Sequence, residues 1–366
     1  MKQLALLILA VLPCCGAWGN GYTYRRTLTI DKTKVPNTDQ TNFPMLFSGT
    51  YDYLAHTTHS PGKVTDLNGY DIIFTSDAAG STKLDHEIES YAHDTGVCVF
   101  WVRIPTVATA SDTLIYVFYG NSSVTTSQQS IAGVWNSDYT GVWHLPNGAT
   151  LSTVDSKGAF NFTNVNSVAA VTGKLDGGAG TFYDVTYLKI NGDAAFNTAN
   201  WTAEAWWYRT GGPATYGNNI LAHAQSTGAA GHWALYGDAA NKLVVDIPWV
   251  KGEVVVGGTT VPLNAWSHVV ATKSGNTYTV YLNGASDGSA SDASAPTVSG
   301  NVYAGGAEAG TGNPLAGSLD ELRISATARS GDWVATSYNN QSSPGTFYAL
   351  GTEVAASQRR RVVIVQ

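Results

Sequence analysis

Residues 266–284, "WSHVVATKSGNTYTVYLNG", decide the fold class predicted for the C-terminal half of the chain. Two runs rich in Val, Tyr, Thr and Trp flank the turn residues Ser274, Gly275 and Asn276. Strand-forming runs separated by so short a turn are typical of a β-hairpin. The stretch therefore predicts antiparallel sheet and not helix.

The same pattern extends outward to most of the chain. Between about 139 and 350 it includes "WTAEAWWYR", "KLVVDIPWV" and "GSLDELRIS", and between 22 and 121 it includes "YTYRRTLTI", "VCVFWVRI" and "DTLIYVFYG". Gly, Asn and Pro clusters separate these runs, and no helical period persists between 22 and 121. Since 366 residues exceed one core of about 100–200 residues, the sequence predicts an all-β protein with two antiparallel β-sandwich domains.

Composition shifts along the chain suggest the domain boundaries. A polar link, "NSSVTTSQQS" at 121–130, separates the two strand-rich parts. We place the first sandwich at 20–130, the second at 131–352, and a basic flexible tail at 353–366. The tail carries Arg359–Arg361, to which the sequence assigns no role, and its apolar run is too short to cross a bilayer.

Residues 1–19 have the pattern of a secretory signal peptide. An early Lys precedes an apolar run from Leu4 to Leu12, and small residues lead to a predicted cleavage after Gly19. Pro13 argues against a lipoprotein signal with an acylated cysteine. We therefore expect a secreted or cell-surface protein with no transmembrane span in the mature chain.

Charge and cysteine content narrow the class further. The formal net charge is −7 with no basic stripe, which argues against a nucleic-acid partner. Cleavage of the leader removes two of the three cysteines and leaves Cys98, so the mature chain has no internal disulfide and depends on its hydrophobic core. We expect Cys98, in "GVCVFWVRIP", to be a small buried apolar residue.

Two family resemblances follow from these stretches. "YRRTLTIDKTKV", "NGYDIIFTSDAAGSTKLDHEIESY" and "DTLIYVFYGN" resemble the bacterial domain of unknown function 2341. "WTAEAWWYR", "LNAWSHVVATKSGNTYTVYLNG" and "LAGSLDELRIS" resemble the laminin G-like, concanavalin A-like jelly roll that often follows it. The resemblance implies a lectin-class sandwich, common in secreted or surface bacterial proteins that bind glycans or other matrix ligands. The same fold also carries hydrolases, so the resemblance alone does not define an activity.

Asp85, Glu87 and Glu89 in "KLDHEIESY" form a carboxylate row at every second position of a predicted strand. Alternation places all three on one face, with neighbours about 7 Å apart. Retaining glycosidases need two carboxyls about 5–5.5 Å apart, and jelly-roll glycosidases display a similar row, with Glu at both outer positions. Here Asp85 leads instead. The alternative is a solvated strand face held by cross-strand pairs with Lys83, Arg103 or nearby histidines, and the sequence favours it.

The resemblance also implies a possible Ca²⁺ site. Hard cations take 6–8 oxygen ligands from loops rich in Asp and Asn. The candidate metal ligands are Asp176 and Asp184 near the start of the jelly roll and Asp320 near its end. Asp320 has a second interpretation, in which it pairs with Arg323 or caps a turn.

Aromatic side chains are the candidate ligand-binding residues, because the apolar face of a pyranose packs on an aromatic plane. Trp206 and Trp207 are adjacent in one strand and must face opposite ways, so one is expected in the core and the other exposed or covered by a partner. Trp249 and Tyr216 lie beside turns. For each of these residues the alternative is a place in the core, and the sequence favours that alternative.

Three function hypotheses remain open from the sequence. The leading one is a non-catalytic secreted or cell-surface binding protein that recognises a polysaccharide or glycoconjugate, or another extracellular ligand, through the jelly roll. The second is a glycoside hydrolase in which Glu87 and Glu89 of the carboxylate row serve as nucleophile and acid. The third is a structural envelope or virion-surface protein that binds other protein chains.

Overall fold

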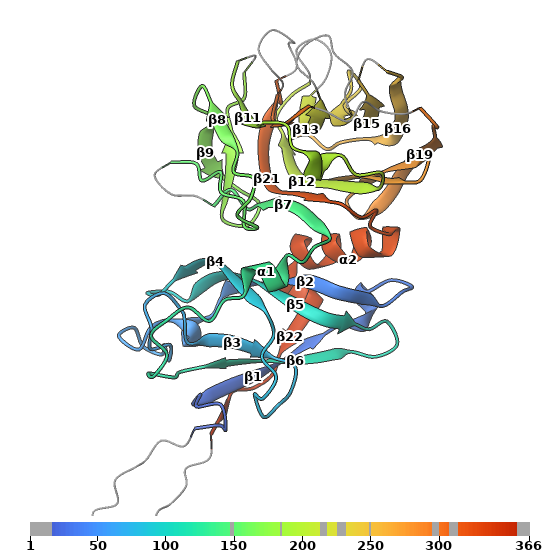
Figure 1. Cartoon of the computed structure of the whole chain (residues 1–366). Helices are drawn as coiled ribbons and strands as arrows, with labels where there is room; N and C mark the ends of the chain where they lie inside the picture. The colour runs from blue at the N-terminus through green and yellow to red at the C-terminus, as the bar shows by residue number, and fades with distance from the viewer. Residues whose placement is uncertain are drawn as a thin grey trace, which may run out of the picture.

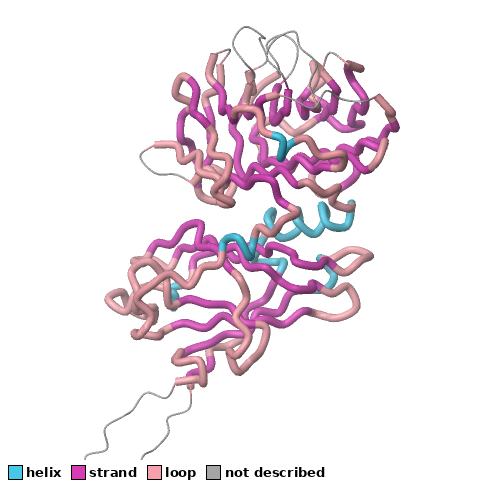
Figure 2. The backbone as a smooth tube through the Cα atoms, in the orientation of Figure 1, coloured by secondary structure: helices cyan, strands magenta, loops and turns pink. Residues whose placement is uncertain are grey.

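The computed structural model contains two β-sandwich domains, one above the other in Figure 1. It describes residues 17–146, 150–183, 185–212, 218–224, 232–248, 250–294, 300–306 and 314–356. Strands dominate both domains, and the helices are few and lie mainly between them (Figure 2). The all-β prediction is confirmed, because alternating runs rich in Val, Thr, Tyr and Trp suit a pleated surface that is buried on one side.

The N-terminal domain pairs a five-stranded sheet with a three-stranded one. The five-stranded sheet has the order β22-β1-β6-β3, with β23 also paired to β1. Its strands are Tyr24–Ile30 (β1), Ile72–Thr75 (β3), Thr113–Tyr119 (β6), Tyr348–Leu350 (β22) and Val354–Ala355 (β23). The other sheet, β2-β5-β4, contains Gln40–Thr50 (β2), His86–Ala92 (β4) and Val97–Val107 (β5). The two sheets enclose a core that includes Phe47, Phe74 and Phe100.

Two larger antiparallel sheets form the C-terminal domain. The eight-stranded sheet has the order β19-β18-β17-β12-β21-β10-β9, with β7 paired to β21. Its strands are Tyr139–Trp143 (β7), Ala169–Thr172 (β9), Gly177–Gly180 (β10), Trp201–Arg209 (β12), Trp266–Ser274 (β17), Thr277–Leu282 (β18), Ala285–Ser291 (β19) and Gly317–Ser325 (β21). The seven-stranded sheet has the order β16-β15-β14-β13-β20-β11-β8 and contains Thr163–Val165 (β8), Tyr187–Ile190 (β11), Asn218–Ala224 (β13), Trp233–Gly237 (β14), Lys242–Ile247 (β15), Gly252–Thr260 (β16) and Asn301–Ala304 (β20).

The predicted hairpin at 266–284 is confirmed. Strands β17 and β18 pair from Val269 opposite Leu282 to Ser274 opposite Thr277, which leaves Gly275 and Asn276 as the turn. Gly275 has a φ of 59°, a conformation that glycine adopts without a steric penalty. The register directs the alternate residues of both strands into the core between the two sheets.

Three helices and three 3-10 turns complete the described chain. The helices are α1 (Ile131–Val134), α2 (Gly331–Ser342) and α3 (Pro344–Phe347), and the 3-10 turns are Lys32–Lys34, Asp52–Leu54 and Ala194–Phe196. Helix α2 lies between the domains, as Figure 1 shows. Its N-cap is Ser330, whose hydroxyl accepts a hydrogen bond from the Trp333 amide, a standard start signal for a helix.

The predicted C-terminal boundary at 352 is wrong. After α2 the chain returns to the N-terminal domain, where β22 and β23 both pair with β1. Glu353 there forms ion pairs with Lys63 and Arg26 and accepts a hydrogen bond from Tyr119. The first domain is therefore built from both ends of the described chain, and the C-terminal domain is inserted between them.

The described chain begins just inside the predicted leader. Trp18 packs edge-on against Phe118, with ring centroids 6.2 Å apart, and the Arg25 guanidinium lies 4.0 Å over the Trp18 ring. Cleavage after Gly19 would remove these contacts. None of the helices in the described part of the chain combines the length and apolar composition that a bilayer crossing requires.

Candidate functional site

The carboxylate row lies on the face of the β4 sheet that points toward the C-terminal domain. Glu87 pairs in register with Trp101 of β5, and Glu89 sits at a β-bulge between Ile88 and Ser90. Asp85 directly precedes the strand and contacts Arg103 of β5. The prediction of a shared face is confirmed, but for Glu87 and Glu89 the prediction of a solvated face is wrong. The C-terminal domain covers these two side chains, whose exposed fractions are 7% and 1%.

Asp85 fits the structural interpretation. Its carboxylate accepts hydrogen bonds from two nitrogens of the Arg103 guanidinium, one of them Nε at 3.1 Å. Burial acts to raise the pKa of this carboxyl, but the hydrogen bonds and the charge of Arg103 outweigh it and lower the pKa. The pair is about one-third exposed, so it contributes little to stability.

Glu87 is buried with three side-chain donors around it. It accepts hydrogen bonds from the indole N–H of Trp135 and from the Ser156 hydroxyl at 2.7 Å, and His144 Nε2 lies 3.2 Å from its Oε2. Burial acts to raise the pKa of Glu87, but the attraction and hydrogen bond of His144, with the other two donors, lower it. Glu87 is therefore held as a carboxylate.

Glu89 has a different environment although it is only two residues away. Its Oε2 accepts a hydrogen bond from the Trp101 indole at 2.6 Å and lies 3.3 Å from His144 Nδ1. Its Oε1 is buried and has no hydrogen-bond partner among the residues that the structure describes. Burial, followed by repulsion from Glu321, raises the pKa of Glu89 well above its usual range.

His144 connects the three glutamates. It directly follows β7, its Nε2 faces Glu87, and its Nδ1 lies 2.8 Å from Glu321 Oε1 and 3.3 Å from Glu89 Oε2. Its ring stacks on Trp101 with centroids 5.6 Å apart. Burial acts to lower the pKa of His144, but the three carboxylates raise it well above its usual range.

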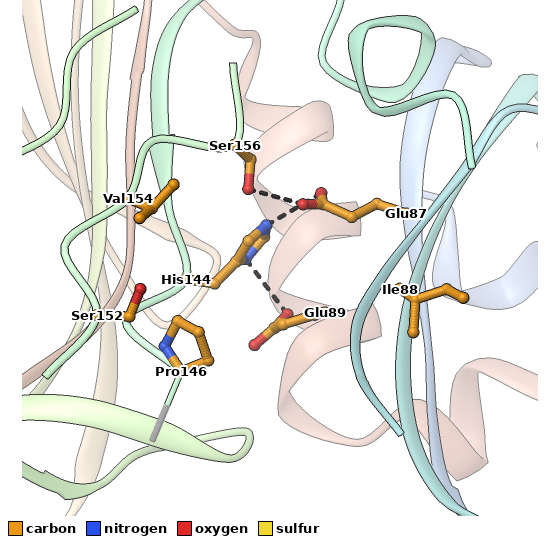
Figure 3. Close-up of a pocket in the computed structure, with 8 residues that line it drawn as sticks. All are labelled: Glu87, Ile88, Glu89, His144, Pro146, Ser152, Val154 and Ser156. Carbon is orange, nitrogen blue, oxygen red and sulfur yellow. Dashed lines mark hydrogen bonds and ion pairs between the residues drawn. The ribbon is translucent and has the colours of Figure 1, made fainter. Parts of the chain in front are cut away.

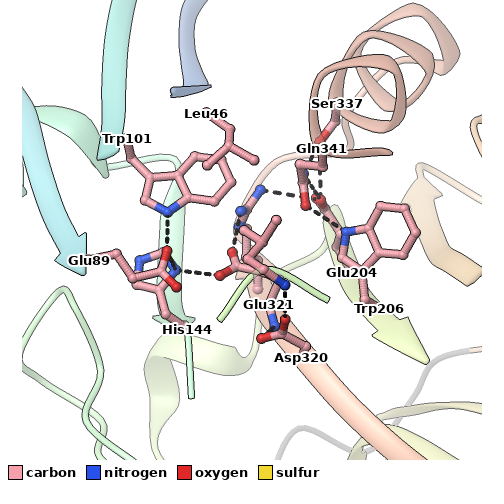
Figure 4. A network of polar contacts seen from close by, with 12 residues as sticks. Leu46, Glu89, Trp101, His144, Glu204, Trp206, Asp320, Glu321, Ser337 and Gln341 are labelled. Atoms are coloured by element: carbon pink, nitrogen blue, oxygen red, sulfur yellow. Dashed lines mark hydrogen bonds and ion pairs between the residues drawn. The ribbon is translucent and has the colours of Figure 1, made fainter. Parts of the chain in front are cut away.

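Glu321 and Arg323 extend this polar network into the eight-stranded sheet. Arg323 donates hydrogen bonds to Glu321 Oε2 and, at 3.3 Å, to Glu204 Oε1, and its guanidinium lies 4.3 Å over the Trp101 ring. We call Glu87, Glu89, His144, Glu321 and Arg323 the interdomain cluster. Figure 4 shows Glu89, His144 and Glu321 in one chain of contacts beside Trp101.

The network continues from Glu204 to helix α2. Glu204 Oε1 also accepts from Ser337 and Gln341 and lies 2.9 Å from His268 Nε2. Burial acts to raise the pKa of Glu204, but Arg323 and these hydrogen bonds lower it to about 2. Polar side chains of both domains and of α2 therefore satisfy one another in a buried layer, the arrangement that buried charges require.

Irregular backbone directs the side chains of the interdomain cluster. Glu321 and Leu145, next to His144, have φ angles of 53° and 56°. Non-glycine residues adopt this left-handed conformation at a cost of about 1–2 kcal/mol each. The pairing of β12 with β21 shifts register between Glu204 and Trp206, opposite Glu321, so both Glu89 and Glu321 sit at β-bulges. Bulges re-aim side chains and are frequent beside functional sites.

A pocket of about 290 Å³ borders the cluster. It is lined by Glu87, Ile88, Glu89, His144, Pro146, Ser152, Val154 and Ser156. Figure 3 shows the His144 ring between the Glu87 and Glu89 carboxylates. The imidazole thus fills the space that a sugar would need between two catalytic carboxyls, and the geometry gives no support to the catalytic prediction for this row.

Three residues of the cluster could hold a metal ion. Within the described ranges, Glu89, His144 and Glu321 each offer one ligand atom, and these atoms lie within 4.8 Å of one another. No sequence pattern indicated this grouping, because His144 and Glu321 stand alone in "GVWHL" and "GSLDELRIS", far from the carboxylate row in the chain.

The structure describes two of the three Ca²⁺ ligands predicted from the sequence, Asp176 and Asp320. Asp320 Oδ2 accepts hydrogen bonds from the backbone amides of Lys174 and Leu175, so it caps the turn between β9 and β10, as its second interpretation predicts. Asp176 accepts from the Gly177 amide. Asp184 lies outside the described residues, and the Ca²⁺ site therefore stays a prediction.

Neither described tryptophan candidate faces solvent. Trp207 is in the core between the sheets. Trp206 points the other way, and α2 covers it: its indole donates to Gln341 Oε1 at 2.7 Å and its ring stacks on Tyr338. The covering partner is thus a helix of the same chain, and neither ring offers a surface to a sugar. Trp249 and Tyr216 lie outside the described residues.

The two sheets of the C-terminal domain have different outer faces. We call the outer face of the eight-stranded sheet, which carries Glu204, Trp206 and Arg323 under α2 and the N-terminal domain, the proximal face. We call the outer face of the seven-stranded sheet, which carries Tyr236 and Asp246, the distal face; Figure 1 places β13, β15 and β16 on the side away from the N-terminal domain.

Polar and aromatic side chains meet on the distal face. Trp233 and Leu235 of β14 point into the core, so Tyr236 points outward by alternation. Asp246 of β15 pairs in register with Glu253 of β16, and the Tyr236 hydroxyl donates to Glu253 at 3.3 Å. Asp246 is half-buried, and its Oδ1 is buried without a hydrogen-bond partner in the described ranges. Burial, with repulsion from Glu253, raises the pKa of Asp246 to about 7.

Comparison with solved structures finds similar folds with low sequence identity. The fourth domain of an extracellular arabinanase from Geobacillus stearothermophilus, solved with arabinotriose, is 16% identical, with 55% of this chain and 98% of that chain covered and a TM-score of 0.41. The binding domain of Paraclostridial Mosquitocidal Protein 1 is 12% identical, with 55% and 51% covered and a TM-score of 0.44. Trypanosoma rangeli sialidase in complex with sialic acid is 12% identical, with 72% of this chain and 45% of the sialidase covered and a TM-score of 0.44.

Family comparison assigns both halves of the chain. No curated protein matches the sequence. The domain of unknown function DUF2341 matches residues 68–137, and the concanavalin A-like lectin/glucanases superfamily matches residues 184–335. The order agrees with the sequence resemblance. The chain therefore carries a DUF2341 domain followed by a domain of the concanavalin A-like lectin/glucanases superfamily.

Proposed function

We propose that this protein is an exported, non-catalytic binding protein whose C-terminal domain recognises carbohydrate on its distal face. One observation carries the proposal: a tyrosine and two acids, Tyr236, Asp246 and Glu253, lie together there. The superfamily match over 184–335 supports the class of ligand.

The chemistry of these three side chains suits a sugar. A tyrosine ring offers an apolar plane to the face of a pyranose, and its hydroxyl forms hydrogen bonds. The carboxyl groups of Asp246 and Glu253 accept hydrogen bonds from sugar hydroxyls.

The test is retention of the protein by polysaccharides. Affinity electrophoresis of the exported chain through a panel of soluble polysaccharides, with and without calcium, is expected to identify one or more that retard it. Tyr236→Ala should abolish the retardation. Tyr116→Ala is the matched control, since Tyr116 is a half-buried tyrosine of the N-terminal domain, and it should leave retardation unchanged. No retardation by any member of the panel would contradict the proposal.

A second candidate function has one observation in its favour. Asp246 and Glu253 are cross-strand partners beside a β-bulge, so two carboxyl side chains lie next to each other on adjacent strands, and retaining glycosidases use two neighbouring carboxyls. A pKa of about 7 for Asp246 suits a general acid. Release of reducing sugar that is lost in both Asp246→Asn and Glu253→Gln, without loss of folding, would favour a glycoside hydrolase over a binding protein.

Export is proposed from the leader pattern of residues 1–19. N-terminal sequencing of the protein recovered outside the cell tests export. The position of the cleavage site is informative as well, because Trp18 contacts Phe118 and Arg25. A first residue of Asn20 would support the predicted cleavage site, and Trp18 would support a site that preserves the packing on Phe118. A full-length chain retained in the cytosol would contradict export.

A further inference from the structure

We propose that the interdomain cluster is a binding site for one divalent transition-metal ion, with Glu89, Glu321 and His144 Nδ1 as its ligands. Zinc is the ion whose chemistry the site fits best. The inference is independent of carbohydrate binding, because the site lies on the opposite side of the jelly roll from the distal face.

The ligand atoms are already close to a coordination shell. His144 Nδ1 is 2.8 Å from Glu321 Oε1 and 3.3 Å from Glu89 Oε2, and one atom from each residue fits within 4.8 Å of the others. Two ligands bound tetrahedrally to zinc at about 2.1 Å lie about 3.4 Å apart. Small side-chain rotations would therefore close the three atoms around an ion.

A buried oxygen of Glu89 has a free position that an ion could fill. The Glu89 side chain is 1% exposed, yet within the described part of the chain its Oε1 has no hydrogen-bond partner, and Glu89 lines the pocket beside His144. A buried oxygen without a partner costs about 1–3 kcal/mol. A cation that Glu89 binds through Oε1, alone or together with Oε2, would remove that cost, and the pocket of about 290 Å³ leaves room for a water as the fourth ligand.

The contacts behind the ligands are those of a metal-binding histidine. When Nδ1 binds a metal, the other ring nitrogen usually donates to a carboxylate that fixes the ring. His144 Nε2 faces Glu87, which Trp135 and Ser156 hold in turn. Glu321 is fixed through its other oxygen by Arg323, whose charge Glu204 also balances.

Ligand type selects the ion. One imidazole nitrogen and two carboxylates suit zinc and its neighbours, whereas calcium takes 6–8 oxygens. Asp320 uses both carboxylate oxygens on the backbone amides of Lys174, Leu175 and Glu321, so it adds no ligand. The site is therefore distinct from the calcium site predicted from the sequence.

The test is metal binding by the whole chain after chelation and removal of the chelator. Equilibrium dialysis with zinc chloride, read by elemental analysis, is expected to give one tightly bound zinc per chain. Cobalt chloride should give visible absorption bands typical of a four-coordinate site with nitrogen and oxygen ligands. Calcium chloride at the same concentration should not compete.

Three variants make the assignment specific. Glu89→Gln and Glu321→Gln keep the side-chain shape and should each weaken zinc binding by about 100-fold or more, and Glu87→Gln by about 10–100-fold. Glu253→Gln on the distal face is the matched control and should bind zinc like the unmodified chain. Near-ultraviolet circular dichroism of each variant checks that the fold is intact.

Two results would overturn the proposal. The first is no zinc or cobalt bound by the folded, unmodified chain. The second is zinc binding that the folded Glu89→Gln variant retains in full. Loss of zinc binding in Glu89→Gln with unchanged polysaccharide retardation would support this site whatever the outcome for the distal face.

Discussion

The proximal and distal faces of the C-terminal domain carry acidic side chains of the same kind in opposite conditions. On the proximal face, Glu204 and Glu321 are fully covered and surrounded by donors from Arg323, His268 and α2. On the distal face, Asp246 lies in register with Ala234 and with the acidic Glu253, and its Oδ1 has no hydrogen-bond partner among the described residues.

The difference shows in the direction of the pKa shifts. Arg323 and hydrogen bonds bring the pKa of Glu204 to about 2 despite its burial, whereas burial and repulsion from Glu253 bring the pKa of Asp246 to about 7. A buried acid with partners holds the architecture together. A half-buried acid without partners lowers stability, which is common at sites that bind something else.

The largest expected effect comes from removing the positive charge of Arg323 on the proximal face. Arg323→Met should lower the free energy of unfolding by about 3–5 kcal/mol, because it leaves Glu204 and Glu321 buried without their partner. Urea unfolding followed by tryptophan fluorescence measures the change. Arg103→Met is the control: its pair with Asp85 is partly exposed, so the loss should stay below about 1 kcal/mol. Equal losses in the two variants would contradict the comparison.

The second effect is on acid stability. In the folded chain the pKa of Glu204 is about 2, whereas in the unfolded chain its pKa is near 4.5. The unfolded state therefore binds more protons between these values, and about 3 kcal/mol of stability should be lost as the pH falls from 4.5 to 2. Urea titrations at several pH values measure this slope.

The control for the acid effect is the pair Glu204→Gln and Glu253→Gln. Glu204→Gln should be less stable at neutral pH and should lose less stability on acidification than the unmodified chain. Glu253→Gln should keep the original slope, since Glu253 is exposed. A slope that Glu204→Gln leaves unchanged would show that other acids carry the acid sensitivity.

The third effect comes from the distal face and is a loss of stability as the pH rises, whereas Glu204 causes a loss as the pH falls. The pKa of Asp246 is raised in the folded state to about 7 from 3.8, so the folded state binds more protons in this range and loses stability as the pH rises through it. Asp246→Asn should therefore stabilise the protein at pH 8 by about 1 kcal/mol or more. The gain should vanish near pH 4, and thermal unfolding at the two pH values measures it. Destabilisation at pH 8 would contradict the assignment.

The smallest effect on stability is expected from Tyr236→Phe. The hydrogen bond to Glu253 is 3.3 Å long and exposed, so its loss should change the free energy of unfolding by less than about 0.5 kcal/mol. Polysaccharide retardation should nevertheless weaken. A large loss of stability without a change in retardation would show that Tyr236 is a structural residue and not a binding residue.

The strand pattern of the sequence was sufficient for the fold but not for the helix between the domains. Runs such as 266–284 carry the period and turn chemistry of hairpins, and the structure forms them. Helix α2 was missed, although Ser330 and Asp332 in "SGDWVATSYNN" are a recognisable helix start. The return of residues 348–355 to β1 could not be predicted, because strand partners far apart in sequence leave no local signal.

The carboxylate row shows the same limit at the site. Alternation placed Asp85, Glu87 and Glu89 on one face, and the expected pair of Asp85 with Arg103 is present. Whether that face meets water is not a property of the strand. The C-terminal domain buries Glu87 and Glu89 against His144, whose position depends on a contact between two domains.

The sheets and the side chains that share a strand face could be read from the sequence, since these follow from periods of two residues and from local turns, and the order of the two domains from the family resemblance. The pairing of the carboxylates, the direction of each pKa shift and the meeting of three residues from distant strands at the proposed metal site arise only when the chain folds. Those properties depend on burial and on the distance between charges, and neither is fixed until the two domains and helix α2 pack together.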